Sequence, residues 1–378
     1  MRWRTMMRIA LRMALHEKMK FAGAMVGVVF AVLLSNQQAA TFLGLVNRNI
    51  MFVDNAGADI WIMPGATEIL QPGKFLSTSP LDQARGTPGV AWAEPILFGS
   101  ATVSLPQGGS EQVTLIGTRA PSWRGGPFNL VAGSADALTQ PDAMIFEDSD
   151  RGKLGGLNLG SIREVNGRRT HVVGFTWGLV PLGPASYAFA EFDLARELMH
   201  SDADQFSFIL VGAQPGADLQ AIKRELQRRM SSERVATRAE FKRSLLNYTI
   251  FKTPIGIVLG SSSAVGLLVG FIMVALTMFS AVLDNLREFG TLKALGATTF
   301  DLVRLLWTQA AIYGALGAFV GVALVSQAAS AARSAQLAMQ LPPALLFGTL
   351  VVAIAMCIAA SSLAVLRVRS VEPAMVFR

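Results

Sequence analysis

Residues 253–283, TPIGIVLGSSSAVGLLVGFIMVALTMFSAVL, contain no charged side chain. A helix needs about 20 mostly apolar residues to cross the roughly 30 Å hydrocarbon core of a bilayer, so this stretch predicts a membrane-spanning helix. Residues 305–332 and 334–366 are equally free of charge and predict two further spans. The last third of the chain therefore indicates a helical membrane protein.

A fourth apolar segment lies near the N-terminus. Residues 21–34 form a short apolar run, the polar patch 35–38 (SNQQ) follows it, and apolar residues resume over 39–46. A cleaved signal peptide also has a basic start and a short apolar centre. Here the basic leader is long, and no small-x-small cleavage motif ends the run. We interpret 21–46 as a first transmembrane helix that continues outward as a stalk.

Basic residues predict the orientation of these helices. The chain is 52% hydrophobic and 16% charged, and its net charge is +7. Lys and Arg gather before the first span, between the second and third spans, and after the last, which is the pattern of cytoplasmic segments. We favour this topological explanation over nucleic-acid binding. The expected protein is multi-pass in a bacterial inner membrane, with both termini in the cytoplasm.

The predicted organisation has nine parts. They are a cytoplasmic amphipathic helix (1–20), helix 1 with its stalk (21–46), an extracytoplasmic domain (47–252), helix 2 (253–283), a cytoplasmic segment (284–304), helix 3 (305–330), a short outside loop (331–344), helix 4 (345–366) and a cytoplasmic tail (367–378).

The leader shows a helical repeat of basic residues. Every fourth position is basic, at Arg4, Arg8, Arg12, His16 and Lys20. Apolar residues from Trp3 to Met13 lie on another face, which is typical of an amphipathic helix on an anionic membrane surface. Charges that only set topology would explain the sign of this pattern but not its spacing.

The segment 47–252 alternates strand-like and helix-like patterns, which predicts a mixed α/β domain with a strand-rich insertion at about 120–190. Asn166-Gly167 separates two apolar runs and predicts a hairpin turn, and Asp218 precedes a periodic helix as its N-cap. The expected strands are 58–63, 113–117, 161–165, 171–175, 206–211 and 235–237, and the expected helices are 219–230 and 238–248.

The sequence shows no pattern of catalytic, cofactor-binding or metal-binding residues. The three histidines are far apart in sequence, the HExxH, CxxC, GxSxG and GxxxxGK[ST] motifs are absent, and Cys357 is the single cysteine. Asp148 with Asp150, and Asp202 with Asp204, are interpreted as solvated loop acids. We expect no enzyme activity on this chain.

One stretch after the second span resembles a known family. Residues 287–297, REFGTLKALGA, are similar to the segment that follows helix 2 in the permeases of the MacB, FtsX and LolC/E type, the mechanotransmission class of ABC transporters. The order of spans and the outside domain resembles that family over the whole chain. Residues 58–64 are similar to a strand of its DevC-like exporter group. The hairpin region 153–175 and the tail 371–378 also resemble the family, although Ser161 replaces a common aspartate and Val376-Phe377 a usual Ala-Leu.

The resemblance implies a function and partners. A homodimer of permeases would bind two copies of an ABC ATPase, which carry ATP and magnesium, together with a periplasmic adaptor. ATPase motion would reach the outside domain through the segment after helix 2. The residues implied in ATPase coupling are Arg287, Glu288, Thr291, Lys293, Ala294, Gly296 and Ala297. The expected function is the permease subunit of an ABC exporter. The alternatives are an FtsX-like signalling device that controls envelope enzymes, and a membrane-anchored receptor without an ATPase.

The polar patch of the first span has three open interpretations. Its side chains belong to a solvated stalk, form hydrogen bonds across a dimer within the bilayer, or line a substrate path. The residues concerned are Ser35, Asn36, Gln37 and Gln38.

Overall fold

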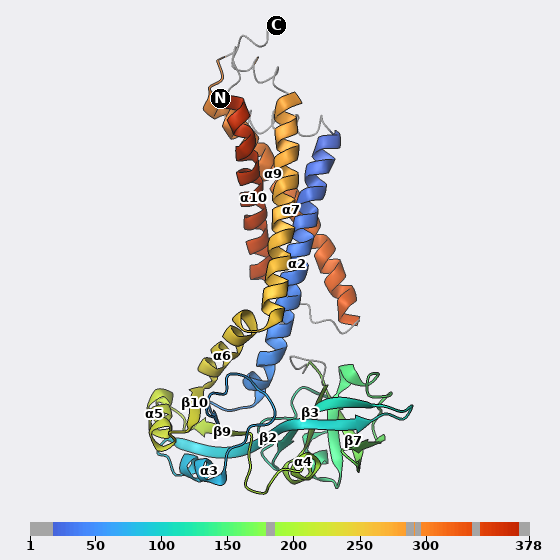
Figure 1. Ribbon diagram of the computed structural model, residues 1–378, viewed down its shortest axis with the longest axis vertical. Helices are drawn as coiled ribbons and strands as arrows, with labels where there is room; N and C mark the ends of the chain where they lie inside the picture. Colours follow the sequence, from blue (N-terminus) through green and yellow to red (C-terminus); the bar gives the residue numbers. More distant parts are fainter. Residues whose placement is uncertain (1–17, 179–185, 285–290, 292–295, 335–340, 370–378) are drawn as a thin grey trace. The chain divides into compact units, whose positions relative to one another are not determined.

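The computed structural model describes residues 18–178, 186–284, 291, 296–334 and 341–369 (Figure 1). These residues belong to two compact units. The membrane unit lies within Met1–Gly44 and Pro254–Arg378, and the α/β unit is Leu45–Thr253.

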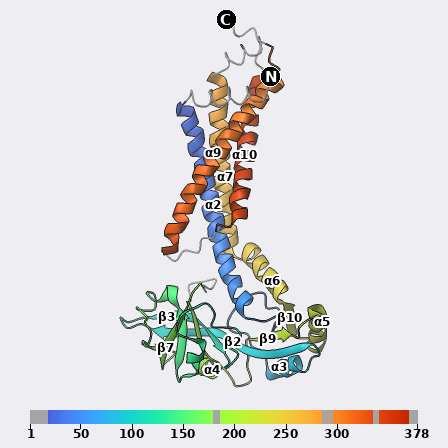
Figure 2. The ribbon, with the colours of Figure 1, turned by 180° about the vertical axis from the view of Figure 1, so that it is seen from behind.

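Four long helices form the membrane unit, namely α2 (Lys18–Asn55), α7 (Pro254–Asp284), α9 (Thr299–Ser334) and α10 (Pro343–Arg369). They run side by side as a bundle (Figures 1 and 2). Each contains a segment long and apolar enough to cross a membrane, at Ala22–Gly44, Gly256–Thr277, Thr299–Ser330 and Pro343–Leu363. The predicted fold class, four transmembrane helices with a mixed α/β domain after the first, is confirmed.

Glycines allow the helices of the bundle to approach closely. A Cβ atom added at Gly314 of α9 would lie 2.9 Å from the Cα atom of Ile354 on α10, and one at Gly317 would lie 2.5 Å from Cγ1 of Val28 on α2. In lipid no hydrophobic force drives helices together, so close packing at small residues supplies much of the association energy. The bundle therefore depends on close approach of the α10 backbone at Gly314 and of the Val28 side chain at Gly317.

The α/β unit is built on one ten-stranded mixed sheet. Its strand order is β10-β1-β9-β2-β3-β8-β5-β7-β4, and β6 pairs with β2 and β7. The β3–β8 and β5–β7 pairs are parallel and the others antiparallel. The strands are β1 (Ile60–Pro64), β2 (Val90–Ser104), β3 (Ser110–Thr118), β4 (Leu130–Ala132), β5 (Ala143–Glu147), β6 (Ile162–Val165), β7 (Arg168–Thr176), β8 (Ser186–Glu191), β9 (Phe208–Ala213) and β10 (Glu233–Thr237).

Both faces of this sheet are covered. Successive residues of a strand point to opposite faces, and in β1 Ile60 and Ile62 join one hydrophobic cluster whereas Trp61 and Met63 join the other. Helices α3, α4 and α5 contribute to the first cluster, while the end of α2 and helix α6 contribute to the second. The helices beside the first face are α3 (Thr78–Arg85), α4 (Phe192–Met199) and α5 (Leu219–Arg229), and α6 is Arg238–Phe251. Two short 3-10 helices, Ala135–Thr139 and Asp148–Asp150, complete the elements of the unit.

Several sequence predictions for the α/β unit are confirmed. The hairpin pairs Val165 with Arg168 across Asn166-Gly167, and both turn residues have positive φ, as a tight hairpin turn requires. The Asp218 side chain accepts a hydrogen bond from the Gln220 backbone N–H at 2.8 Å and caps α5.

Two helices differ in length from the predicted segments. Helix α2 does not stop near residue 46 but continues to Asn55, because Phe52 and Val53 are apolar and fill the core of the α/β unit. Helix α9 begins at Thr299 and includes Arg304, which the sequence places in the turn before the third span. The reason is a capping arrangement at Thr298, described below.

Candidate functional site

The segment after α7 holds the residues expected to bind an ATPase. Arg287, Glu288, Lys293 and Ala294 lie outside the described residues, and Thr291 is exposed. Gly296 has φ +96, a conformation that residues with a Cβ atom rarely adopt. Ala297 packs against the hydrophobic cluster of the bundle. The described end of the segment is therefore attached to the membrane helices.

A capping box fixes where this segment becomes helix α9. The Thr298 backbone N–H donates to Oδ2 of Asp301 at 3.0 Å, and the Asp301 backbone N–H donates to Oγ1 of Thr298 at 3.2 Å. These reciprocal bonds satisfy donors that a helix N-terminus leaves unpaired. The start of α9 is thus tied to Thr298, the residue that directly precedes it.

The interfacial helix of the leader stays a prediction. Arg4, Arg8 and Arg12 lie outside the described residues. The backbone at Lys20 is helical, within the first turn of α2.

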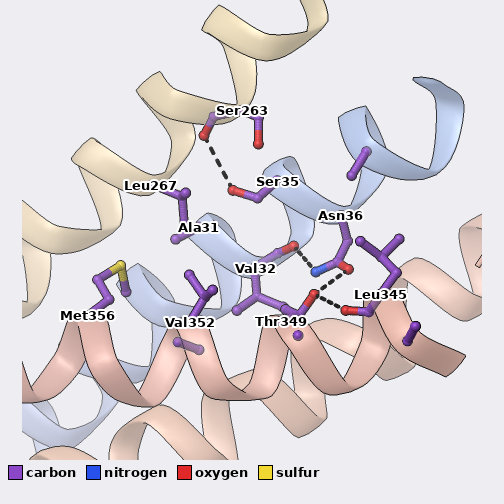
Figure 3. A pocket seen from close by; sticks show the side chains of 14 residues that line it. Ala31, Val32, Ser35, Asn36, Ser263, Leu267, Leu345, Thr349, Val352 and Met356 are labelled. Carbon is purple, nitrogen blue, oxygen red and sulfur yellow. Dashed lines mark hydrogen bonds between the residues drawn. The ribbon is translucent and has the colours of Figure 1, made fainter. Parts of the chain in front are cut away.

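The residues of the polar patch of α2 (35–38) differ in burial and in hydrogen bonding, and Figure 3 shows two of them, Ser35 and Asn36. Asn36 is only 1% exposed. Its Nδ2 donates to the Val32 carbonyl at 2.8 Å, and its Oδ1 accepts from the Thr349 hydroxyl of α10 at 2.8 Å. The Ser35 hydroxyl donates to the Ser263 carbonyl of α7 at 3.4 Å.

The other two side chains of the patch are more accessible than Asn36. Gln37 is exposed and Gln38 is half-buried. The structure therefore gives Ser35 and Asn36 hydrogen bonds within one chain, to α7 and α10 respectively.

The end of α2 is embedded in an aromatic cluster of the α/β unit. Phe52 is fully buried. Its ring centroid lies 5.7 Å from that of Phe128, 6.1 Å from that of Trp61 and 6.2 Å from that of Tyr187, which it stacks on. Trp61 belongs to β1 and Tyr187 to β8, and three strands lie between these two in the sheet order. One side chain of α2 therefore contacts both halves of the sheet.

Helix α6 is fastened beside the end of α2. Lys242 Nζ lies 2.8 Å from Oδ2 of Asp54, and the Arg238 side chain donates to the Ala58 carbonyl at 2.7 Å and to Asp59 at 3.2 Å. Exposed ion pairs contribute at most about 1 kcal/mol each. Within the α/β unit these contacts join α6 to the end of α2 and to the residues that follow it.

A second capping box begins helix α6. The Glu240 backbone N–H donates to Oγ1 of Thr237 at 3.3 Å, and the Thr237 backbone N–H donates to the Glu240 carboxylate at 2.9 Å. Partial burial opposes ionisation of Glu240, but hydrogen bonds from Lys223 and from Thr237 outweigh it and hold the pKa of this carboxyl below its ordinary value of 4.5. Folding therefore favours the ionised carboxylate of Glu240.

Replacing Thr237 by Ala is expected to destabilise the start of α6. Loss of an N-cap side chain costs about 1 kcal/mol, so hydrogen exchange at the first amides of α6 should accelerate by about fivefold. Because the pKa of Glu240 is lowered on folding, its ionised carboxylate stabilises the folded state above pH 4.5. This contribution to the free energy of unfolding is lost as the pH falls below 4.5. Thr237→Ser should keep the wild-type exchange rates, and equal rates in the Ala variant would contradict the assignment.

Sequence reasoning missed three features of these sites. Thr349 is a polar residue within an apolar span, which is itself a signal of a partner inside the membrane. The spacing of Thr237 and Glu240 is that of a capping box. Phe52 follows the basic residue Arg48, which obscured the continuation of the helix.

Among the described residues, no three His, Cys, Asp or Glu side chains gather closely enough to hold a metal ion.

Two family models match the chain. The MacB-like periplasmic core domain matches residues 21–229, and the FtsX-like permease C-terminal model matches residues 260–373. Together they cover the first span, most of the α/β unit and the last three spans.

Curated relatives show the same likeness. An uncharacterised ABC transporter permease of Mycobacterium tuberculosis is 26% identical over 282 residues, 72% of this chain and 71% of the relative. An uncharacterised ABC transporter permease of Methanocaldococcus jannaschii is 22% identical over 178 residues. The matched residues are 44% of this chain and 43% of that relative, so the match spans less than half of the relative's length.

The extracellular domain of the noncanonic ABC-type transporter YknZ from Gram-positive bacteria is 17% identical, with a TM-score of 0.36, covering 48% of this chain and 99% of that domain. The periplasmic region of MacB from Actinobacillus actinomycetemcomitans is 12% identical, with a TM-score of 0.39. The match covers 52% of this chain and 96% of that region.

Proposed function

Because this chain belongs to the family of MacB- and FtsX-type ABC transporter permeases, we propose that it transmits the motion of a separate ATPase to its α/β unit and thereby drives export. The observation that carries the proposal is helix α2. It is continuous from Lys18 to Asn55, contains the candidate span Ala22–Gly44, and ends with Phe52 buried in the aromatic cluster. A helix resists bending, so displacement of the span reaches the sheet through this side chain.

The second connection enters the same cluster. Helix α6 buries Phe241 and Leu245 beside Phe52 on one face of the sheet. After α6 the chain passes through Lys252 and Thr253 into α7, and α7 leads to the proposed ATPase-binding segment. The end of α2 and helix α6 thus belong to one packed cluster of the α/β unit, on which motion of the spans would act.

The proposed partners follow from the family and from the charge distribution. Two ATPase subunits, with bound ATP and magnesium, would bind the 284–304 segment, and a second copy of this chain would complete the permease. A periplasmic adaptor would receive the motion of the α/β unit. The basic residues next to the spans favour an inner-membrane protein with both termini in the cytoplasm.

Reversing two charges of residues 284–304, the proposed coupling segment, is expected to release the ATPase. The double variant Arg287→Glu, Lys293→Glu should recover about tenfold less ATP-hydrolysing subunit than wild type when the chain is purified from solubilised native membranes. The matched control is Arg224→Glu, Arg228→Glu on exposed positions of α5, which changes the net charge equally.

The control variant should recover the ATPase at the wild-type level. Wild-type protein that recovers no nucleotide-hydrolysing subunit would contradict ATPase coupling and support a membrane-anchored receptor. An equal loss in both double variants would show that the coupling segment has no special role.

A further inference from the structure

A pocket of about 270 Å³ lies within the membrane unit, between α2, α7 and α10 (Figure 3). Its described wall contains no charged residue. Most of the lining side chains are small or apolar, and polar groups come from Ser35, Asn36, Ser263 and Thr349. The pocket therefore suits an uncharged, mainly apolar ligand.

The pocket is elongated along α10. Its lining residues on that helix extend from Ala344 to Met356, which is about 18 Å at 1.5 Å per residue. Ala344 directly follows the first residue of the candidate span Pro343–Leu363. One end of the pocket thus lies at the edge of the hydrocarbon layer, and the other end lies past its middle.

Gly348 keeps part of this space open. A Cβ atom added at Gly348 would meet no atom within 4 Å, whereas one added at Gly314 would meet the backbone of α10. A glycine inside a helix is less favourable than alanine by about 1 kcal/mol. Close helix packing explains the glycine at 314 but not the one at 348, where the missing side chain leaves room in the pocket.

Asn36 brings a hydrogen-bond donor to the pocket wall. A carboxamide has two N–H donors, and Nδ2 of Asn36 donates to one acceptor among the described residues, the Val32 carbonyl. The residue is 1% exposed, and a neutral amide adds no charge that would favour a phosphate or an ammonium group.

The polar groups are grouped toward one end. Asn36 is eight residues from Gly44, and Thr349 is six residues from Pro343, at the ends of their candidate spans. At 1.5 Å per residue both lie within about 12 Å of the edge of the hydrocarbon layer. In a hydrocarbon layer of about 30 Å both residues lie inside one leaflet, below the ester groups and at the depth of an acyl chain.

We propose that the pocket binds an acyl chain of a bilayer phospholipid, with the chain beside Gly348. The bilayer surrounds this unit, so acyl chains are the ligand at highest local concentration. The site goes beyond the export function and requires no ATPase. Because the pocket lies where Asn36 meets Thr349, the bound chain would contact both α2 and α10.

The test is photo-crosslinking in vesicles. Full-length protein is reconstituted into phosphatidylethanolamine and phosphatidylglycerol vesicles that contain a trace of phosphatidylcholine with a diazirine in one acyl chain. Peptide mass spectrometry after illumination locates the adducts. In wild type we expect labelling at 344–356 to exceed labelling around Phe319, an exposed residue of α9 that does not line the pocket, by about tenfold.

Matched glycine variants test the role of the pocket. Gly348→Leu places a side chain in the space and should reduce labelling at 344–356 by about tenfold. Gly260→Leu, whose Cβ atom also meets nothing within 4 Å but which does not line the pocket, should leave it unchanged. Ala344→Leu, at an exposed pocket residue, gives a second obstruction with little risk to folding.

Three outcomes would overturn the proposal. The first is wild-type labelling at 344–356 no greater than around Phe319, which includes the case of a second copy that covers the pocket. The second is undiminished labelling in both obstructing variants with wild-type helical content. The third is dependence on headgroup charge, because replacing phosphatidylglycerol by phosphatidylcholine should not change labelling at a site without charged residues.

Discussion

Replacing Phe52 by Ala is expected to lower the local unfolding free energy of the α/β unit by about 3–5 kcal/mol, the usual cost of emptying a buried phenylalanine site. The Phe52 ring contacts aromatic rings from β1, from β8 and from the loop before β4. Hydrogen exchange of the unit in the full chain measures the loss. The same change should also interrupt transmission from α2.

A matched variant separates stability from transmission. Phe146 is equally buried but belongs to the cluster on the opposite face of the sheet. Phe146→Ala should destabilise the unit by a similar amount, yet folded molecules should still couple ATP hydrolysis to transport. Phe52→Ala should leave ATP hydrolysis in the assembled complex but abolish coupled transport. Equal coupling in the two variants at matched amounts of folded protein would refute a specific role for Phe52.

Replacing Gly314 by Leu is expected to disrupt the membrane bundle. An added Cβ atom would lie 2.9 Å from the Cα atom of Ile354 and 3.2 Å from its backbone nitrogen, and a helix backbone cannot move aside as a flexible side chain can. Overpacking an ordinary core costs about 1–3 kcal/mol. Because the neighbour here is the backbone of α10, we expect the cost at Gly314 to be about 3 kcal/mol or more. The melting temperature in detergent and the yield of monodisperse protein should both fall.

The control for this experiment is the same substitution on an open helix face. Gly260→Leu on α7 meets no atom within 4 Å, so its melting temperature should match or exceed that of wild type, because leucine favours helix more than glycine does. A Gly314 variant as stable as this control would show that α9 and α10 do not depend on their close approach.

Local patterns were sufficient for much of the fold. The Asn166-Gly167 hairpin and the Asp218 cap each depend on residues that are neighbours in sequence, and the structure shows both. The spans follow from length and absence of charge, which also act locally. These features are set before any distant contact forms.

The sites depend on contacts between distant residues. Asn36 and Thr349 are separated by 313 positions, and no single-sequence pattern pairs them. The polar patch predicted a special role but could not identify the helix that Asn36 faces. Likewise, Phe52 is one of the four apolar residues 50–53 that follow Arg48 closely in sequence. Only the packed sheet shows that it contacts Trp61 and Tyr187.

The pairing of β1 has a consequence for how the α/β unit is made. This strand is the first to emerge, but its two partners are β9 and β10, the last strands of the unit. It must therefore wait, with both backbone edges unsatisfied, until almost the whole unit has been synthesised and moved across the membrane. Folding by this route is slow because its decisive contacts are remote in sequence. A chaperone that shields newly exported chains would have its greatest effect on the stretch around Ile60 and Trp61.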